Sequence, residues 1–261
     1  MARARQQLSS SVSDRYRRDG FVATFGVGRG LSSEQRAERA RRTAARAQPF
    51  TVSADGGVTV SYYRHNDPEA AVLHREDGPA RCEVYADGGR TEQWFAEGQL
   101  HRHSGPAVVD DRADGTHISY YYDLGRLHRE DGPARIEERV DGTRILQWFH
   151  NDQLDRADGP AYIETRTNGI RVEQYCRGSQ LHRIDGPALI RHDADGGGVE
   201  EYYVHGERHR EDGPARIEIS AAGKRSELYY RHDQRISSAP PGGPLRTPAF
   251  TSGLRASARS R

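Results

Sequence analysis

The sequence predicts an all-β protein: an elongated antiparallel array of β-hairpins, strongly twisted, with a short N-terminal helix and disordered tails. Three observations lead to this fold class. The tripeptide Gly-Pro-Ala recurs six times at a constant spacing of 27 residues, apolar residues alternate after each tripeptide, and a turn pair follows each alternation. Units this short and polar cannot bury a core alone, so we expect them to stack side by side along one axis.

Two segments precede the array. Residues 1–31 are rich in Arg, Ser and Gly, and we expect a disordered arm there. Residues 32–48 are expected to form a basic helix, which Ser32 can cap and Gln35 can close as a capping box. The apolar stripe of this helix consists of alanines, which bury little area, so the helix should dock weakly or cap the first strand.

Each unit begins with a strand. The alanine of Gly-Pro-Ala and the residue two positions later face the same side, as in Ala134 and Ile136, which is the pattern of a half-buried strand. A turn follows ten residues after the glycine, and five of the six turn pairs are Asp-Gly or Asn-Gly. These pairs close two-residue hairpins, so consecutive strands should be antiparallel neighbours.

The second strand of each unit carries a bulky pair of residues six and seven positions after the turn. Adjacent strand residues point to opposite faces, so each face should carry one column of these side chains. The columns can stack and hold the sheet together. An exposed column would instead be a candidate interaction surface, and its residues are Trp94, Tyr121, Trp148, Tyr175, Tyr202 and Tyr229.

The array is expected to span residues 49–236. Asp55-Gly56 and Tyr62-Tyr63 repeat the pattern of turn and aromatic pair before the first Gly-Pro-Ala, which gives seven hairpins. Their fourteen strands exceed the ~10 strands at which open sheets curl or split, so strong twist or curvature is expected. Residues 237–261 are rich in Pro, Gly, Ser and Arg, as in a disordered tail.

The tripeptide usually ends the longer phrase Leu-His-Arg-x-Asp-Gly-Pro-Ala. Its histidines recur two strands apart, about 9.6 Å at 4.8 Å per strand, whereas two ligands of one zinc ion each lie within about 2.1 Å of it. We therefore expect a histidine ladder and no metal, with Asp155 replacing the histidine of the fourth unit. Arg-to-Asp pairing and a kink at Gly-Pro complete the phrase. Structural roles are assigned to His74, Arg75, Asp77, Gly78, Gly105, Arg129, Asp131, Gly132, Gly159, Gly186 and Gly213.

Catalysis needs different residues that converge at one place, and in a repeat array such a site should interrupt the pattern. The interruptions are scattered over separate units and form no triad or carboxylate dyad; they are Cys82, His103 with Ser104, Asp155, Cys176 and Arg208. We expect neither an enzyme nor a cofactor.

Charge is distributed unevenly. Residues 1–48 carry 11 Arg against 4 acidic residues (+7), and residues 237–261 carry 4 Arg against none (+4), so the array carries +1 − 11 = −10. The basic termini could contact nucleic acid, anionic lipid or the array itself, or they could simply be solvated.

The two cysteines lie in different units, too far apart for a disulfide. Free thiols favour a cytoplasmic location. The stretch 21–28 after Arg17 and Arg18 resembles a twin-arginine export signal only faintly, because its apolar part is barely long enough and Arg29 follows at once. No stretch reaches the ~18 apolar residues of a membrane span.

The repeated phrase resembles the MORN-type repeats, specifically the bacterial and viral variant known as YwqK-like antitoxin-component repeats. The resemblance covers about residues 55–236 and implies an elongated sheet of hairpins that serves as an interaction scaffold, in some relatives as the antitoxin partner of a toxin. MORN units are shorter and lack Gly-Pro-Ala, so the lipid association of some MORN proteins carries over poorly.

These observations predict a non-catalytic β-repeat scaffold that binds a protein partner. Two alternatives stay open: an antitoxin or immunity protein that neutralises a toxin, and a nucleic-acid binder that acts through the Arg-rich termini.

Overall fold

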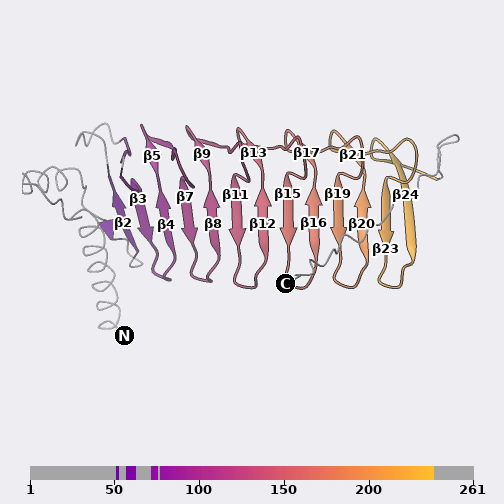
Figure 1. Cartoon of the computed structure of the whole chain (residues 1–261), viewed down its shortest axis with the longest axis horizontal. Helices are drawn as coiled ribbons and strands as arrows, with labels where there is room; N and C mark the ends of the chain where they lie inside the picture. The colour runs from indigo at the N-terminus through magenta and orange to yellow at the C-terminus, as the bar shows by residue number, and fades with distance from the viewer. Residues whose placement is uncertain (1–50, 53–56, 63–71, 76, 238–261) are drawn as a thin grey trace, which may run out of the picture.

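The computed structural model describes residues 51–52, 57–62, 72–75 and 77–237. In these residues every regular element is a strand, and the strands form one long, open antiparallel sheet with a row of short hairpins along one edge (Figure 1). The all-β hairpin array predicted from the sequence is confirmed. The predicted arm at 1–31, the helix at 32–48 and the tail beyond Ser237 lie outside the described residues.

The main sheet contains fourteen strands, because the last of the fifteen in the hydrogen-bonded order, β25, pairs only with the end of β24. The fourteen strands are β1 (Thr51–Val52), β2 (Val58–Ser61), β3 (Arg81–Val84), β4 (Arg90–Gln93), β7 (Val108–Asp111), β8 (His117–Tyr120), β11 (Arg135–Glu138), β12 (Arg144–Gln147), β15 (Tyr162–Thr165), β16 (Arg171–Gln174), β19 (Leu189–His192), β20 (Gly198–Glu201), β23 (Arg216–Ile219) and β24 (Arg225–Arg231).

Each unit contributes two hairpins, and the second one was not predicted. In each unit we call the strand directly after Gly-Pro-Ala the leading strand and the next main strand the following strand. These two strands form the long hairpin. The chain then bends at the first residue of the bulky pair and forms a short hairpin. The short strands are β5 (Phe95–Ala96), β6 (Gln99–Leu100), β9 (Tyr122–Asp123), β10 (Arg126–Leu127), β13 (Phe149–His150), β14 (Gln153–Leu154), β17 (Cys176–Arg177), β18 (Gln180–Leu181), β21 (Tyr203–Val204), β22 (Glu207–Arg208) and β25 (Gln234–Ile236).

The two kinds of hairpin use different turns. In the long hairpin the glycine N–H of the Asp-Gly pair donates to the carbonyl three residues earlier, as Gly142 does to Arg139 at 2.9 Å, and only the glycine has positive φ. This is a three-residue loop that ends in a left-handed glycine, so the predicted two-residue turn is wrong. The two-residue turn with positive φ at both positions occurs in the short hairpins, for example at Asn151 and Asp152.

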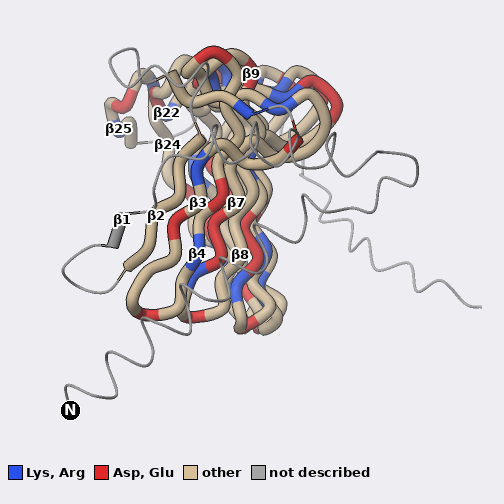
Figure 2. Tube along the Cα trace, turned by 90° about the vertical axis from the view of Figure 1, so that its left-hand side faces the viewer, with Lys and Arg blue, Asp and Glu red and all other residues tan. Residues whose placement is uncertain are grey.

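The short hairpins continue from unit to unit. The second turn residue of each donates its N–H to a carbonyl of the preceding short hairpin, as Gly125 does to Leu100 at 2.8 Å and Asp152 to Leu127 at 2.9 Å. Viewed along the array, this second row spreads out of the plane of the main strands (Figure 2). The protein is therefore a sheet with a bent margin.

The axes of the main strands are nearly aligned from β2 to β24, with alternating chain direction, so the sheet is less twisted than its strand count led us to expect (Figure 1). Sheets of many strands stay flat when ladders of side chains fix each strand against its neighbours. The bend between the two rows carries such a ladder, described below.

Two faces follow from the alternation of side chains. We call the face that carries Glu92 and Trp94 the ladder face, and the face that carries Thr91 and Gln93 the carboxylate face. Neither has a second layer of strands over it in the described residues. Some apolar side chains are nevertheless fully buried within this single layer: Ile118 and the alanines of Gly-Pro-Ala are 0% exposed.

Candidate interaction surface

Arginines cover five of the six rings of the predicted aromatic column, and they cover Tyr62 before it; the sixth predicted residue, Tyr229, instead donates its hydroxyl to Glu227 at 2.9 Å. The first aromatic residue of a unit stacks under the guanidinium of the next Leu-His-Arg phrase, a cation–π contact worth about 1 kcal/mol. The distances from guanidinium carbon to ring centroid are 4.3 Å for Arg75 on Tyr62, 4.0 Å for Arg102 on Trp94, 4.0 Å for Arg129 on Tyr121, 4.2 Å for Arg156 on Trp148, 3.9 Å for Arg183 on Tyr175 and 4.0 Å for Arg210 on Tyr202. These six pairs are the arginine–aromatic ladder.

The repeated phrase holds each arginine in place. Arg129 Nε donates to Asp131 Oδ1 at 2.9 Å, and Arg129 Nη1 donates to the carbonyl of Pro133 at 3.4 Å. A Cβ on Gly132 would stand 3.1 Å from the guanidinium carbon, so only glycine leaves room for the stacked group. The arginine thus lies between an aromatic ring and a glycine and is hydrogen-bonded to the aspartate of the same phrase.

The histidine column supports the short hairpins. The Nδ1 of His74, His101, His128 and His182 accepts the N–H of the first turn residue in the next short hairpin, at 3.1–3.4 Å. Asp155 does the same in the fourth unit, where its Oδ2 accepts the N–H of Gly178 at 2.9 Å. Both side chains act as acceptors, which explains why aspartate can replace histidine at this position. In the described residues no group of three or more His, Cys, Asp or Glu side chains could hold a metal ion.

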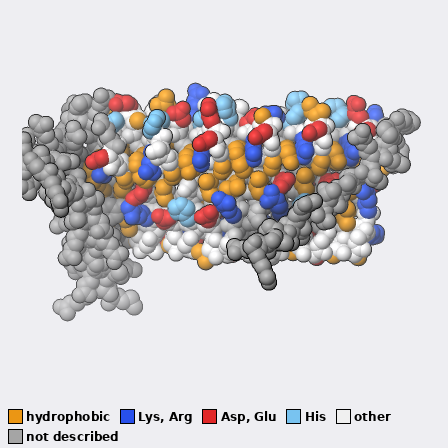
Figure 3. Space-filling view, viewed as in Figure 1, with side chains coloured by type: hydrophobic (Ala, Val, Ile, Leu, Met, Phe, Trp, Pro, Cys, Tyr) orange, Lys and Arg blue, Asp and Glu red, His pale blue; other side chains and the backbone are white. Residues whose placement is uncertain are grey.

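Between the bend and the long turns, the ladder face carries half-buried apolar side chains. We call this set the apolar strip; its members are Val109, Ile136, Leu146, Ile163 and Ile190. Figure 3 shows a band of apolar side chains that crosses the strands between two margins of charged ones. Exposed carboxylates border it at the bend, with side-chain exposures of 85% for Asp131, 80% for Asp158 and 83% for Asp185. Hydrogen bonds from the neighbouring arginines lower the pKa of all three.

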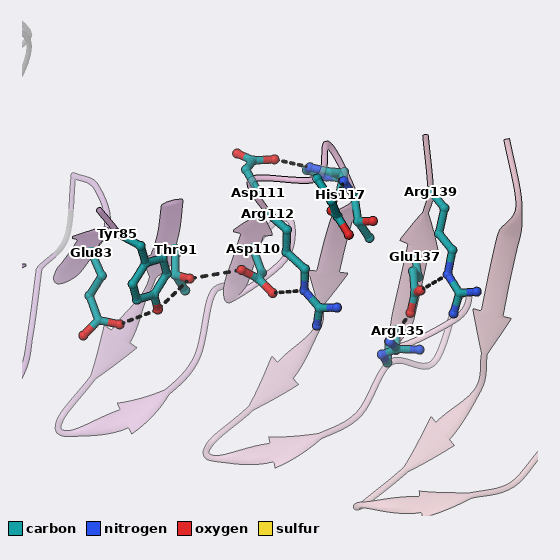
Figure 4. Close-up of polar contacts among 12 residues, drawn as sticks. Glu83, Tyr85, Thr91, Asp110, Asp111, Arg112, His117, Arg135, Glu137 and Arg139 are labelled. Carbon is teal, nitrogen blue, oxygen red and sulfur yellow. Dashed lines mark hydrogen bonds and ion pairs between the residues drawn. The ribbon is translucent and has the colours of Figure 1, made fainter. Parts of the chain in front are cut away.

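The opposite face carries a row of ion pairs (Figure 4). Glu137 is 4% exposed and accepts hydrogen bonds from Arg135 and from Arg139, the latter at 2.5 Å. Burial raises the pKa of Glu137, but the two arginines outweigh it, so the pKa is lowered overall. Asp110 likewise accepts a hydrogen bond from the arginine two residues later, Arg112, at 3.1 Å. In the fifth unit the order of charges is exchanged, because Arg191 pairs with Asp193.

The fifth unit also contains an incompletely partnered carboxylate on the ladder face. Glu92, Glu173 and Glu227 pair with an arginine two residues earlier, whereas Gly198 occupies that position before Glu200. Glu200 Oε2 is buried and accepts no hydrogen bond from the described residues. Burial raises the pKa of Glu200.

Arg208, one of the interruptions in the pattern, is explained by a second change in the same unit. Glutamine, tyrosine or leucine occupies the position of Glu201 in the other units, and Glu201 is 4% exposed. It pairs with Arg216, while Arg208 Nη2 lies 3.7 Å from Glu201 Oε1. The fifth unit therefore carries both an extra buried carboxylate, Glu201, and an extra arginine, Arg208, beside it.

The other interruptions do not converge either. Cys82 and Cys176 are both buried, lie in different units and form no disulfide. Burial, with a smaller contribution from Asp155, raises the pKa of Cys176 to about 11, which disfavours the thiolate needed for nucleophilic chemistry. Asp155 is held by Gly178 and by Arg177 at 3.2 Å. In the described part of the chain, no helix has the length and apolar character of a membrane span.

No protein-family model matches the chain, and no curated protein matches it. Among solved structures, it is similar to the TCP10c domain of Drosophila melanogaster Sas-4, with 15% identity, a TM-score of 0.28, and coverage of 68% of this chain and 96% of that chain. It is also similar to the TCP10 domain of Danio rerio CPAP, with 16% identity, a TM-score of 0.25, and coverage of 73% and 94%. With TM-scores this low, these similarities assign no function to this chain.

Proposed function

We propose that this protein is a non-catalytic scaffold that binds a protein partner along its ladder face. The observation that supports the proposal is the apolar strip, which crosses successive strands without a second layer over it in the described residues. A repeated, flat strip offers contact area, and a partner that follows it crosses two strands, about 9.6 Å, per unit.

The charge around the strip specifies the chemistry of that partner. The array carries a net charge of −10, and exposed aspartates at the bend border the strip. A partner segment with apolar side chains flanked by Arg or Lys would be complementary to this surface. The rings of the predicted candidate surface contribute indirectly, because the arginines that cover them hold these aspartates in place by hydrogen bonds.

Capture of the partner from the native host tests the proposal, with the tagged full chain and two matched variants. Ile184→Asp changes a side chain that is 88% exposed between Arg183 and Asp185, and Val140→Asp changes one that is 73% exposed at a long turn. Mass spectrometry should identify a basic protein that is retained by Val140→Asp and lost from Ile184→Asp. Equal loss from both variants, or no loss from either, would contradict binding along the ladder face.

An antitoxin or immunity role is the narrower form of the same proposal, supported by the resemblance of the repeated phrase to YwqK-like repeats. Co-expression with a toxin gene adjacent in the genome tests it: the full chain should rescue growth, and Ile184→Asp should rescue less well.

Nucleic-acid binding through the Arg-rich termini is the competing function. The acidic array disfavours contact with phosphate, so binding would depend on residues 1–48 and 237–261 alone. DNA and RNA affinities of the full chain, measured over a range of salt concentrations, distinguish the two functions. A steep salt dependence would favour this alternative, and no binding would dismiss it.

A further inference from the structure

The two ends of the main sheet differ, and they are complementary. Within the array every contact between units joins a following strand to the leading strand of the next unit, as β4 joins β7. β24 is a following strand, because it closes the hairpin with β23. β1 is a leading strand, because Val52 lies opposite Val58 in β2 as Val84 lies opposite Arg90 in β4. One end thus presents the surface that the other end fits.

The backbone of β24 is oriented for such a contact. Toward the next unit, the N–H of Trp94 donates to the carbonyl of Ala107 at 2.8 Å, and Tyr202 donates to Ala215 at 2.8 Å. Tyr229 is the equivalent residue of the last unit. In an antiparallel strand alternate residues direct their backbone groups to the same side, so Glu227 and Arg225 face outward with it. In the described residues no strand pairs with the outer edge of Arg225–Leu228.

We propose that a second copy of this chain occupies this edge, with β1 of one copy adding to β24 of the other. The register follows from the internal contacts. Arg90 lies opposite Asp111 between units, and the residues equivalent to them at the ends of the array are Arg225 and Val52. Arg225 therefore lies opposite Val52 of the second copy, and Ser226 lies opposite its Thr51.

The chain's own C-terminal segment fits this edge less well. A strand that continued the array would place residue 244 opposite Glu227, 27 positions after Ile217, which lies opposite Glu200. Every residue at that position in the array donates its N–H to the preceding unit, but residue 244 is Pro244, which has no N–H. The ladder would lose a hydrogen bond at its centre.

Head-to-tail addition leaves one open edge at each end of the assembly, so it does not close and can continue into longer assemblies. This inference stands independently of the proposed function. If both hold, the ladder face repeats along the assembly, and a partner with several binding segments would gain avidity.

A disulfide cross-link tests the register on the full chain. The double variant Val52→Cys with Arg225→Cys should give a series of dimers, trimers and larger species on a non-reducing gel after mild oxidation, and each single variant should stay monomeric. A dimer from Arg225→Cys alone would indicate symmetric edge pairing and overturn the proposal, as would a double variant that stays monomeric.

Sedimentation velocity provides a second test without new thiols. The mass of the unmodified chain should rise with concentration. Glu227→Ala keeps the outward N–H and should associate like the parent, whereas Glu227→Pro removes it and should reduce association at least tenfold. Glu227 does not supply a ladder bond to β23, so circular dichroism should show Glu227→Pro to be folded. A concentration-independent monomer for the parent, or equal association of both variants, would overturn the proposal.

Discussion

The bend and the carboxylate face both hold one unit against the next without a thick core, but they do so through different contacts. At the bend each arginine fits between a ring and a glycine, with an aspartate beside it in five of the six units, and the arginine, glycine and proline recur in all six. On the carboxylate face only opposite charge is needed, and the fifth unit reverses the order of Arg and Asp. Where a contact depends on the shapes of the side chains, the same residues recur in each unit. Where it depends only on opposite charge, the residues differ between units.

The largest expected effect comes from a ring of the ladder. Trp148→Ala removes a half-buried indole and the surface on which Arg156 stacks, 4.2 Å from the ring centroid. We expect the free energy of unfolding to fall by about 3 kcal/mol, as measured by urea denaturation. Gln153→Ala, an exposed change in the adjacent short hairpin, should cost less than about 0.5 kcal/mol.

A double-mutant cycle then isolates the stacking. Trp148→Ala and Arg156→Ala should show a coupling energy of about 1 kcal/mol. Additive effects would mean that the guanidinium does not rest on the ring in solution.

The next effect is on the opposite face. Glu137→Ala leaves Arg135 and Arg139 without their shared carboxylate, and we expect a loss of about 2 kcal/mol at pH 7. Glu138→Ala is the control, because Glu138 is exposed and pairs with Arg144 at 3.2 Å, a surface pair worth under about 0.5 kcal/mol.

The pH dependence of that loss has a definite sign. The folded-state pKa of Glu137 is lowered, so its contribution is complete above its unfolded-state pKa of 4.5 and disappears as the pH falls through the lower folded-state value. The stabilities of parent and variant, measured from pH 7 to pH 3, should therefore converge toward the acid end. A constant difference would contradict the ionic origin.

Glu200 should behave in the opposite way. Its pKa is raised by burial, so its charge costs stability at neutral pH, and that cost disappears as the pH falls below 4.5. Glu200→Gln should stabilise the protein by about 1 kcal/mol at pH 7 and have no effect at pH 4. Chemical denaturation at both pH values checks this, and destabilisation at pH 7 would show that the carboxylate has a partner.

The smallest expected effect, from exchanging charges, distinguishes the carboxylate face from the bend most clearly. Arg191→Glu should cost about 0.5 kcal/mol, and adding Asp193→Arg should restore the loss, because charge alone is needed there. The same exchange at the bend, Arg156→Asp with Asp158→Arg, should not restore stability, because only residue 156 lies over Trp148. Recovery in both places would remove the distinction between the two regions.

Much of the fold could be predicted from the sequence, because the 27-residue repeat determines where each main strand begins. The spacing of Gly-Pro-Ala fixed the order of the main strands and the side of each residue. The short hairpins were missed because their turn pairs differ in type, from Glu97-Gly98 to Asn151-Asp152 and His232-Asp233. Their common feature was spacing: the second residue of the bulky pair lies opposite the residue five positions later, which is Leu in four hairpins, as in Phe149 and Leu154, and Arg in the other two.

Less of the candidate surface could be predicted. The aromatic column and the Arg-x-Asp pairing were both visible in the sequence, but their contact was not, because the bend brings each arginine back over the ring of the preceding strand. Once the bend is known, the role of the glycine is clear, because a larger residue there would leave no room for the guanidinium. The missing partner of Glu200 Oε2 was detectable in principle, since Gly198 breaks a column of Arg and His.

Nuclear magnetic resonance of the arginine side chains tests the ladder most directly. We expect six Nε–H signals shifted by aromatic rings, from Arg75, Arg102, Arg129, Arg156, Arg183 and Arg210. Five should be protected from exchange by their aspartates, and Arg102, which is followed by Ser104, should not. A single averaged, rapidly exchanging signal for all arginines would contradict the ladder.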